Sequence, residues 1–533
     1  MTGWNFADMW EAAADQQPEA PFARQGDRTV LWREADRRAD SIARTLLDAG
    51  AGPQDKVAQY LYNAPEYLES VFACFKASLV PVNTNYRYTE DELVYLWNNA
   101  DAIAVVFHGT FTPTIESIRD RVPSVRTWLW VDDGTGACPT WALPYEDAAT
   151  SATDRVHPPQ GRDGDDLYML YTGGTTGMPK GVMWRQDDLA VVLGAGLGLA
   201  VPEAHDPEFL DTAFSEPGAV GMPACPLMHG TGAFTSFGTL SSAGCVVLLP
   251  SRQFDAAEML DEIDAKGVNA IAIVGDAFAK PILAALDANP GRWDLSSILA
   301  FVSSGVMWSE ETKQGMLAHR PEMLLMDAFS SSEALGMGQS VSGGGAAAKT
   351  ARFEPGLNTI VVGDDGTRVD EPGQIGRLAV GGRQPLGYYK DEEKSAKTFI
   401  VVDGKRYSCP GDYATIDEDG SIKVLGRGSV CINTGGEKVY PEEVEEAVKT
   451  FDGVADAVVV GVPHERFGEM VVAVVQPAGE HLDPEALITH VRGSLAAYKA
   501  PRDIVTVDDI GRAPNGKVDY KRLRSLASDQ LNS

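Results

Sequence analysis

The segment Tyr171-Thr-Gly-Gly-Thr-Thr-Gly-Met-Pro-Lys-Gly181 follows a short apolar run, Leu167-Tyr-Met-Leu170. Its glycines let the backbone turn N–H groups inward, its threonine hydroxyls add hydrogen-bond donors, and Lys180 adds a positive charge. Together these features form a cradle for an anion such as phosphate. A Walker motif would place Ser or Thr directly after Gly-Lys, and the segment lacks that arrangement. A flexible surface loop is the alternative, and the order and spacing of the residues argue against it.

Around this segment, short apolar runs alternate with longer amphipathic stretches from about residue 5 to residue 425. Residues 102–107, 245–249 and 270–274 are predicted to be buried strands, because each is a short apolar run rich in β-branched side chains. A helical pattern at residues 256–263 lies between two of these strands. Alternation of this kind is typical of an α/β architecture with mostly parallel sheets.

The chain has 533 residues, which is too long for one hydrophobic core. The pattern of apolar and polar residues changes around Gly426-Arg-Gly-Ser429. The remainder of the chain is typical of a compact α+β domain of roughly 100 residues. Within it, Tyr440-Pro-Glu-Glu-Val-Glu-Glu446 indicates a helix start, because proline suits the first helical position and acidic residues favour the first turn. We therefore expect a large N-terminal domain followed by a small C-terminal one.

The overall charge limits the partners of the chain. Acidic residues outnumber basic ones by 76 to 45, which leaves a formal net charge of −31. Such a surface repels nucleic acid and anionic lipid, so we expect no nucleic-acid partner. An anionic ligand would need backbone N–H groups, a metal ion and a few well-placed Lys or Arg side chains to overcome this field.

Cysteine usage and hydropathy indicate the compartment. The six cysteines are scattered, without a Cys-x-x-Cys pair or a nearby histidine cluster, so neither a zinc site nor a disulfide framework is expected. The longest apolar stretch, residues 189–202, is short and Gly-rich, whereas a bilayer span needs about 20 residues. No basic region precedes an apolar run at the N-terminus. We therefore expect a cytoplasmic protein without a signal peptide or an integral membrane segment.

Further motifs follow the 171–181 segment in a fixed order. They are Pro226-Leu-Met-His-Gly-Thr-Gly232, Ser303-Ser-Gly-Val-Met307, Asp327-Ala-Phe-Ser-Ser-Ser-Glu333, Tyr407-Ser-Cys-Pro-Gly-Asp-Tyr-Ala414, Asn433-Thr-Gly-Gly-Glu-Lys-Val-Tyr-Pro441 and Arg512-Ala-Pro-Asn-Gly-Lys-Val518. Over nearly the whole chain, the set resembles the signature of the adenylate-forming superfamily. That superfamily includes acyl-CoA synthetases, firefly luciferase and peptide-synthetase adenylation domains. The resemblance implies ATP, Mg²⁺ and coenzyme A as cofactors.

The resemblance also implies a nucleotide site spread over several motifs. The residues expected to hold the β- and γ-phosphates are Thr172, Gly173, Gly174, Thr175, Thr176, Gly177 and Lys180. Those expected to pack on the adenine or line the nucleotide site nearby are Gly305, Val306, Met307, Phe329, Ser330, Ser331 and Ser332. Asp412 would accept hydrogen bonds from the ribose hydroxyls, and Arg427 would approach the ribose or a phosphate. Without the family context, Asp412 would be better interpreted as a turn cap.

Three catalytic residues follow from the same resemblance. Glu333 would ligate Mg²⁺, an ion that needs only one or two carboxylates beside the phosphates. Lys517 would bridge the incoming carboxylate and the α-phosphate, and His229 would sit beside the acyl pocket. Each has an ordinary alternative: a lone histidine is more often structural, and a glutamate or a lysine at a Pro-Asn-Gly turn is usually just solvated.

The chain departs from the usual Tyr-Gly-x-Thr-Glu motif of the family. Phe329 replaces the tyrosine, Ser330 replaces the glycine and Ser332 replaces the threonine. Ser332 keeps a hydroxyl donor, so nucleotide binding is compatible with that change. We expect the changes at Phe329 and Ser330 to reshape the neighbouring acyl pocket.

The resemblance places a hinge after Arg427. The family commonly has Asp or Lys at this hinge, where the chain has Ser429, and Gly428 beside it supplies conformational freedom. The expected domains are residues 1–427 for adenylation, residues 428–430 for the hinge and residues 431–533 for a mobile lid that carries the catalytic lysine. Rotation of the lid would present Gly435 and Gly436, which would line a tunnel for the thiol of coenzyme A.

The expected activity is ATP-dependent activation of a carboxylic acid as its acyl-adenylate, followed by acyl transfer to coenzyme A. Residues 81–88, 387–393 and 426–433 resemble a bacterial branch that includes fatty-acid and steroid side-chain ligases. A hydrophobic acid, medium to long chain or sterol-derived, is therefore the expected small-molecule partner, and an aromatic acid is the runner-up. The oligomeric state is not readable from the sequence, and a homodimer is expected from family habit alone.

Other functional classes compete with this one. A peptide-synthetase adenylation protein would usually carry a fused carrier domain, and no Leu-Gly-Gly-x-Ser-like segment follows Lys517. An acyl-AMP ligase would load a carrier protein instead of coenzyme A, which the Gly435-Gly436 pair mildly disfavours. A luciferase-like oxygenase would need a rare substrate. A non-catalytic nucleotide-binding module would be expected to lack Lys517 or Glu333, and both are present.

Overall fold

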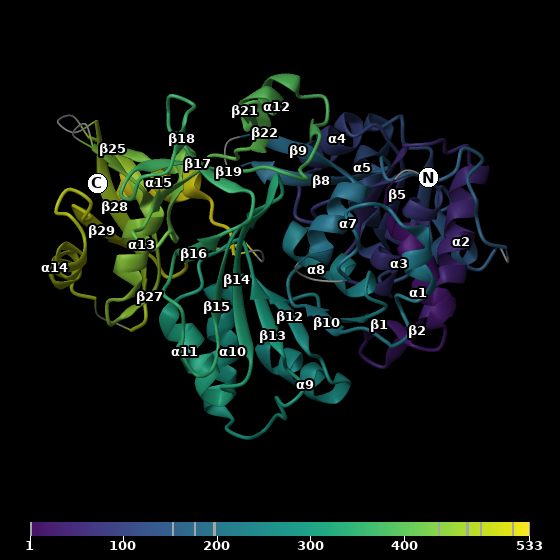
Figure 1. Cartoon of the computed structure of the whole chain (residues 1–533), viewed down its shortest axis with the longest axis horizontal. Coiled ribbons are helices and arrows are strands. Elements are labelled where there is room, and N and C mark those ends of the chain that lie inside the picture. Colours follow the sequence, from purple (N-terminus) through teal and green to yellow (C-terminus); the bar gives the residue numbers. More distant parts are fainter. Residues whose placement is uncertain are drawn as a thin grey trace. The chain divides into compact units, whose positions relative to one another are not determined.

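A computed structural model describes residues 3–151, 154–174, 177–195, 199–434, 437–464, 468–479, 482–513 and 516–531. The chain divides into two compact units. Figure 1 labels their helices and strands along the chain. The first comprises residues 1–336, 340–350 and 382–399, and the second comprises residues 337–339, 351–381 and 400–533. The expected hinge at residues 428–430 lies inside the second unit and stays a prediction. Within the described ranges, no helix is long and apolar enough to cross a membrane.

The first unit contains a sheet in the order β20-β9-β8-β4-β3-β5-β6-β7. Its strands are β3 (Lys56–Tyr60), β4 (Val80–Asn83), β5 (Ala102–His108), β6 (Thr127–Val131), β7 (Leu143–Pro144), β8 (Leu167–Gly174), β9 (Gly177–Arg185) and β20 (Gly387–Tyr388). Strands β3 to β8 pair in parallel, and β9 and β20 are antiparallel. Every residue of β5 is buried, as expected for a parallel strand covered on both faces.

Helices accompany this sheet and the N-terminal part of the chain. They are α1 (Phe6–Gln16), α2 (Trp32–Asp48), α3 (Pro65–Lys76), α4 (Glu90–Asn99), α5 (Thr112–Ile118), α6 (Tyr145–Ala149), α7 (Gln186–Gly194) and α12 (Glu392–Thr398). Helix α4 begins with a capping box, in which Thr89 and Glu92 satisfy each other's backbone N–H groups.

A second run of strands in the first unit has the order β14-β13-β12-β10-β11-β1-β2. The bounds are β1 (Pro21–Gln25), β2 (Arg28–Leu31), β10 (Val220–Pro223), β11 (Cys245–Leu248), β12 (Ala270–Ile273), β13 (Ala300–Ser303) and β14 (Leu324–Ser331). All pair in parallel except β2. Helices α8 (Gly230–Leu240), α9 (Ala256–Lys266), α10 (Asp276–Ala288) and α11 (Glu310–His319) alternate with them. The expected strands at 102–107, 245–249 and 270–274 and the helix at 256–263 are confirmed.

The second unit is built mainly from antiparallel strands. They are β16 (Arg352–Pro355), β17 (Thr359–Val362), β18 (Arg368–Val369), β19 (Ile375–Val380), β22 (Lys405–Ser408), β23 (Asp412–Ile416) and β24 (Ile422–Arg427). Strands β15 (Ala334–Ser342) and β21 (Phe399–Val402) contribute residues to both units. A further sheet contains β25 (Ile432–Thr434), β26 (Glu437–Val439), β27 (Val454–His464), β28 (Gly468–Pro477) and β29 (Asp503–Thr506).

Three helices cover the two faces of that last sheet: α13 (Pro441–Lys449), α14 (Pro484–Ser494) and α15 (Tyr520–Leu531). Successive valines of β27 point to opposite faces because side chains alternate along a strand. Val459 belongs to the cluster with Val444 of α13 and Leu487 of α14. Val458 belongs to the cluster with Leu523 of α15. This arrangement is the α+β C-terminal region expected from the sequence.

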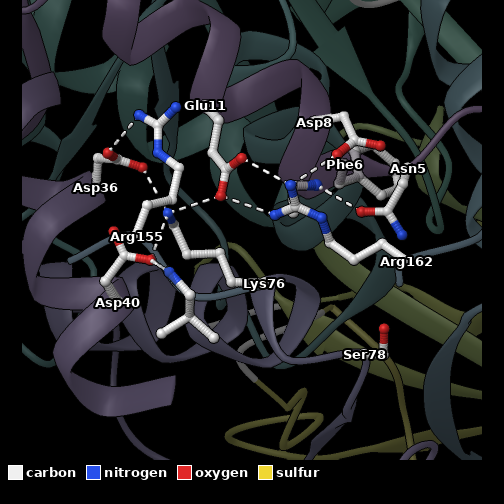
Figure 2. A network of polar contacts seen from close by, with 12 residues as sticks. Asn5, Phe6, Asp8, Glu11, Asp36, Asp40, Lys76, Ser78, Arg155 and Arg162 are labelled. Atoms are coloured by element: carbon white, nitrogen blue, oxygen red, sulfur yellow. Dashed lines mark hydrogen bonds and ion pairs between the residues drawn. The ribbon is translucent and has the colours of Figure 1, made fainter. Parts of the chain in front are cut away.

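A buried ionic cluster joins the N-terminal helices of the first unit (Figure 2). The Lys76 ammonium of α3 is inaccessible to solvent and lies 2.8 Å from Glu11, 2.7 Å from Asp36 and 2.8 Å from Asp40. Arg162 also contacts Glu11, at 2.7 Å. Burial raises the pKa of Glu11, but Arg162 and Lys76 outweigh it and lower that pKa to about 2. The stability that Glu11 contributes is therefore present above about pH 4.5 and is lost as the pH falls towards 2.

We expect Lys76→Met to lower the unfolding free energy of this region by about 3 to 5 kcal/mol, because it leaves buried carboxylates without their shared cation. Methionine keeps most of the side-chain volume. The urea midpoint, followed by tryptophan fluorescence, measures the effect. Lys397→Met is the matched control, since the Lys397–Glu393 pair is exposed and its loss should leave the midpoint nearly unchanged. Equal midpoints for the two variants would contradict a stabilising role for the cluster.

Candidate active site

The segment predicted to cradle phosphate forms the tip of an antiparallel hairpin between β8 and β9. Thr172 lies opposite Lys180, and Gly174 lies opposite Gly177. Gly173 lies between the first of these pairs and the tip, on β8. Thr175 and Thr176 lie outside the described residues. Tyr168, Met169 and Leu170, which lead into the hairpin, are buried, so this part of β8 is packed within the sheet.

Asn83, at the end of β4, ties this hairpin to the next motif. Its amide nitrogen donates to the carbonyl of Tyr171 at 2.9 Å and to the carbonyl of Met228 at 2.6 Å. Its amide oxygen accepts from the N–H of Tyr171 at 2.6 Å. The side chain is buried, which makes these hydrogen bonds costly to lose. Asn83 therefore holds the entry to the cradle beside the residue that precedes His229.

His229 is half-buried and immediately precedes α8. Its backbone N–H donates to the carbonyl of Pro226 at 3.1 Å, and its carbonyl accepts from Ala233 at 2.9 Å. Close packing requires glycine at 232, because a Cβ there would overlap the carbonyl of Pro226, and a Cβ on Gly230 would lie 3.2 Å from Leu170. The structure thus places His229 next to β8, the strand that leads into the cradle.

Lys180 and Glu333 meet at one side chain, Tyr388 of β20. The Lys180 ammonium lies 5.6 Å from the centre of the Tyr388 ring and 3.4 Å from a carboxylate oxygen of Asp391. The Tyr388 hydroxyl donates to Glu333 Oε1 at 2.8 Å. Further along β9, Trp184 Nε1 donates to the carbonyl of Ser332 at 2.9 Å. The expected phosphate-binding cation and the expected metal ligand are therefore neighbours.

The segment expected to pack on adenine follows β13. Gly305 has φ +99°, which favours glycine, and the atom nearest to a Cβ built there is 3.8 Å away in Val274. A flat ring would fit over such an open backbone. Val306 and Met307 are half-buried, and their carbonyls approach Gly275 so closely that a Cβ there would overlap them. The segment lies at the carboxyl end of a parallel strand, where α/β sheets commonly bind ligands.

Phe329, Ser330 and Ser331 end the neighbouring strand, β14, and are half-buried. The Ser330 hydroxyl accepts from the N–H of Gly336 at 3.1 Å, and the Ser331 hydroxyl accepts from the N–H of Ala334 at 3.1 Å. These hydroxyls therefore hold the turn that carries Glu333. The serine at 330, where the family usually has glycine, has a local structural function in the turn.

In the second unit, Asp412 and Arg427 face each other across β23 and β24. Arg427 Nε donates to Asp412 Oδ1 at 3.2 Å. Asp412 is buried, and its other oxygen, Oδ2, has no hydrogen-bond partner among the described residues. A buried acceptor without a partner is costly, and a ribose hydroxyl would satisfy it. The residues present thus fit a bound nucleotide.

Lys517 also belongs to the second unit and is exposed. Its carbonyl accepts from the N–H of Ala513 at 2.8 Å, which closes a turn. Arg512 anchors that turn through a hydrogen bond to the carbonyl of Gly516 at 2.9 Å and an ion pair with Asp456 at 2.5 Å. Hydrogen bonds therefore hold the backbone at Lys517 in place, while its long cationic side chain is exposed.

The remaining expectations concern the thiol tunnel and the metal. Gly435 and Gly436 lie outside the described residues. Within the described ranges, no three His, Cys, Asp or Glu side chains gather as a metal cage. Mg²⁺ does not require one, since it is usually held by one or two carboxylates together with substrate phosphates and water. Glu333 fits a metal ion that arrives with ATP.

The sequence alone did not indicate a role for three residues of this site: Asn83, Tyr388 and Asp391. Asn83 lies in residues 81–88, and Tyr388 and Asp391 lie in residues 387–393. These two segments indicated only a resemblance to one branch of the family. That resemblance was the available signal, and it did not say which side chain of each segment faces the site.

The two units, the glycine-rich β8–β9 hairpin, the turn that carries Glu333 and the buried Asp412 are the features expected of an adenylate-forming protein. The family model described as AMP-binding enzyme matches residues 10–389, and the model described as AMP-binding enzyme C-terminal domain matches residues 443–517. The chain belongs to the AMP-binding enzyme family. The resemblance to the adenylate-forming superfamily is thereby confirmed.

Named relatives cover nearly the whole chain. A 3-oxocholest-4-en-26-oate–CoA ligase of Rhodococcus rhodochrous is 40% identical, over 97% of this chain and 95% of the relative. A medium/long-chain-fatty-acid–CoA/3-oxocholest-4-en-26-oate–CoA ligase of Mycolicibacterium smegmatis is 38% identical, over 99% and 97%. Among solved structures, the anthranilate CoA ligase AuaEII with anthranoyl-AMP has a TM-score of 0.84 at 21% identity, covering 100% and 99%, and this likeness shows the fold alone.

We expect Tyr388→Phe to raise the Mg²⁺ concentration needed for half-maximal pyrophosphate release about fivefold, because Glu333 loses a hydrogen bond that positions it, typically worth about 1 kcal/mol. Phenylalanine keeps the ring beneath Lys180. Tyr389→Phe is the control, since that adjacent tyrosine donates to Asp101 at 2.8 Å instead. An unchanged Mg²⁺ dependence in Tyr388→Phe, or an equal shift in the control, would show that the hydroxyl does not position Glu333.

Proposed function

We propose that the chain is an acyl-CoA synthetase that activates a hydrophobic carboxylic acid with ATP and Mg²⁺ and transfers the acyl group to coenzyme A. The observation that carries the proposal is the meeting of Lys180 and Glu333 at Tyr388. Lys180, the cation proposed for the phosphates, is thus a neighbour of Glu333, the carboxylate proposed for the metal of MgATP. The names of the relatives, which are CoA ligases, agree with this reaction.

The first half-reaction joins two anions. A carboxylate oxygen of the acid attacks the α-phosphorus of ATP, a P–O bond forms, and pyrophosphate leaves. The chain's task is charge compensation and positioning, since the carboxylate is already ionised at neutral pH and needs no general base. Lys180 and the hairpin amides would hold the leaving phosphates, Asp412 would hold the ribose, and Lys517 would approach the α-phosphate and the incoming carboxylate.

The second half-reaction replaces AMP by the thiol of coenzyme A at the acyl carbon. We propose that residues 428–430 act as a hinge between an adenylation part, residues 1–427, and a lid, residues 431–533. Movement of the lid would withdraw Lys517 and bring in the Gly435–Gly436 segment, where the lack of side chains leaves room for pantetheine. One fixed arrangement would not serve both half-reactions, because Lys517 must approach the α-phosphate in the first and leave a path for the thiol in the second.

For the substrate, we propose a medium- or long-chain fatty acid or a sterol side-chain acid. The support comes from full-length relatives named for such acids. We further propose that the enzyme acts in the cytoplasm, which its scattered cysteines support, and that it forms a homodimer, which rests on family habit. Its mass in solution, measured by sedimentation, tests the oligomeric state.

Pyrophosphate release with MgATP across fatty, sterol-derived and aromatic acids, with and without coenzyme A, tests the function. We expect acid-dependent release that turns over rapidly only when coenzyme A is present. Release indifferent to coenzyme A would point to a carrier protein or an amine as acceptor. No release with any acid would overturn the proposed function.

We expect Lys517→Ala to reduce acyl-adenylate formation about 100-fold or more, a loss typical of removing one group that stabilises developing charge. Thiolysis of supplied acyl-AMP by coenzyme A should stay close to wild type, because the lysine serves only the first half-reaction. Lys521→Ala, an exposed lysine at the start of α15, is the control. Equal loss of both half-reactions in Lys517→Ala would contradict this division of labour.

A further inference from the structure

Glu442 reaches from helix α13 back to strand β24, across the segment proposed as the hinge. The backbone N–H of Arg427 donates to Glu442 Oε1 at 3.4 Å. The carboxyl group lies directly over Gly426, where a Cβ would overlap it. Gly426 also has φ +120°, a conformation that favours glycine. The carboxyl of Glu442 thus occupies the place that a side chain would take at residue 426.

The contact between Glu442 and β24 involves Arg427, which also contacts Asp412, and both residues are proposed to bind the nucleotide. Arg427 donates its backbone N–H to Glu442 and its side-chain Nε to Asp412 Oδ1, at 3.2 Å. The neighbouring N–H of Gly428 donates to the carbonyl of Gly411 at 3.0 Å. Glu442, Arg427 and Asp412 therefore form one chain of contacts, with its first member on the far side of the hinge and its last at the ribose position.

The surroundings of the carboxyl group are unusual for a charged group. Oε2 is out of contact with solvent and has no hydrogen-bond partner among the described residues. The titratable and charged groups that face it are Glu445 of the same helix, Arg427 of β24, Asp412 of β23 and Tyr520 of α15. Burial, with the nearby Glu445 and Asp412, raises the pKa of Glu442 to about 8, although the N–H of Arg427 opposes the rise. With its pKa raised this far, the carboxyl is mainly protonated at pH 7.

A neutral amide would fill the same space if the role were only structural. An acid differs in one respect, because it can lose its proton when the surroundings change. Once α13 moves away from β24, the carboxyl enters water, where its ordinary pKa is 4.5. It then ionises at pH 7 and gives its proton to solvent, which disfavours return to the buried position.

We propose that Glu442 is a positioning residue that holds Arg427 and Asp412 in their nucleotide-binding arrangement while α13 lies against β24. When α13 moves away, Glu442 no longer contacts Arg427 and loses its proton to solvent. The proposal rests on the proposed function, since it takes residues 428–430 as the hinge and Asp412 as the ribose ligand. It makes nucleotide affinity dependent on the position of the lid.

The direction of the pH effect follows from the two pKa values. Between about 4.5 and 8 the docked carboxyl is protonated and the released one is not, so each rise in pH weakens docking, by at most about tenfold per pH unit. Above about pH 8 the dependence levels off. Nucleotide affinity should therefore fall as the pH rises from 6 to 8.

The test is ATP binding by calorimetry, in Mg²⁺ without acid or coenzyme A, at several pH values from 6 to 9. Wild type should bind more weakly as the pH rises to 8. Glu442→Gln should keep close to the low-pH affinity throughout, because the amide is neutral and still accepts from Arg427. Glu442→Ala should bind several-fold more weakly at every pH, since that acceptor is gone.

Glu485→Gln is the matched control. Glu485 follows Pro484 in the first turn of α14, as Glu442 follows Pro441 in α13, but its side chain is exposed. This variant should keep the wild-type pH profile, so effects of ATP titration and of the helix dipole are subtracted.

A wild-type pH profile in Glu442→Gln would overturn the proposal, and so would unchanged affinity in Glu442→Ala. Thermal melting of each variant distinguishes these results from unfolding, and the Gln variant remains informative if the Ala variant does not fold. Because binding needs neither acid nor coenzyme A, the expected pH effect without pyrophosphate release from any acid would leave the inference standing while the proposed function fails. Absence of ATP binding by wild type would overturn both.

Discussion

Charge compensation is the constraint on which this structure depends. The chain carries a formal charge of −31, yet its proposed substrates, MgATP and a carboxylate, are anions. Every cation aimed at them must therefore be held in place locally. Lys180 lies over Tyr388 and close to Asp391, Arg427 is held by Asp412, and Lys517 projects from an anchored turn. Positioning of this kind lets a few charges act at short range against an unfavourable overall field.

Rigid elements supply that positioning in the first unit. The cradle hairpin is continuous with a buried parallel sheet, and Asn83 links it by hydrogen bonds to the segment before His229. Glycines allow the same close approach of backbone to backbone, as at Gly232 beneath Pro226. The side chains proposed for chemistry are therefore placed at strand ends, while the strands themselves carry the packing. Buried charges elsewhere, such as Lys76, follow the same rule of local compensation.

The second unit combines the carboxylate proposed to bind the ribose with the proposed hinge. Asp412 has one oxygen engaged by Arg427 and one buried oxygen without a partner among the described residues. Arg427 in turn contacts Glu442, which belongs to the helix after residues 428–430. A carboxyl group that is neutral when buried and charged in water gives this connection two states. The chemistry of two successive half-reactions at one carbonyl requires two arrangements, and a proton-linked contact at the hinge is one physical way to separate them.

Local patterns in the sequence determined the strands at 102–107, 245–249 and 270–274, the helix at 256–263 and the start of α13 at Pro441. Each depends on residues close together in the chain: apolar runs that must be buried, and a proline that suits a helix start. The motif order also indicated the family and the reaction. Only the tertiary structure showed that Asn83 donates hydrogen bonds to the carbonyls of Tyr171 and Met228. It also showed that the Tyr388 hydroxyl donates to Glu333 and that the Glu442 carboxyl lies over Gly426. These partners are far apart in sequence or on separate elements, and their side-chain directions follow from packing, which no local pattern specifies.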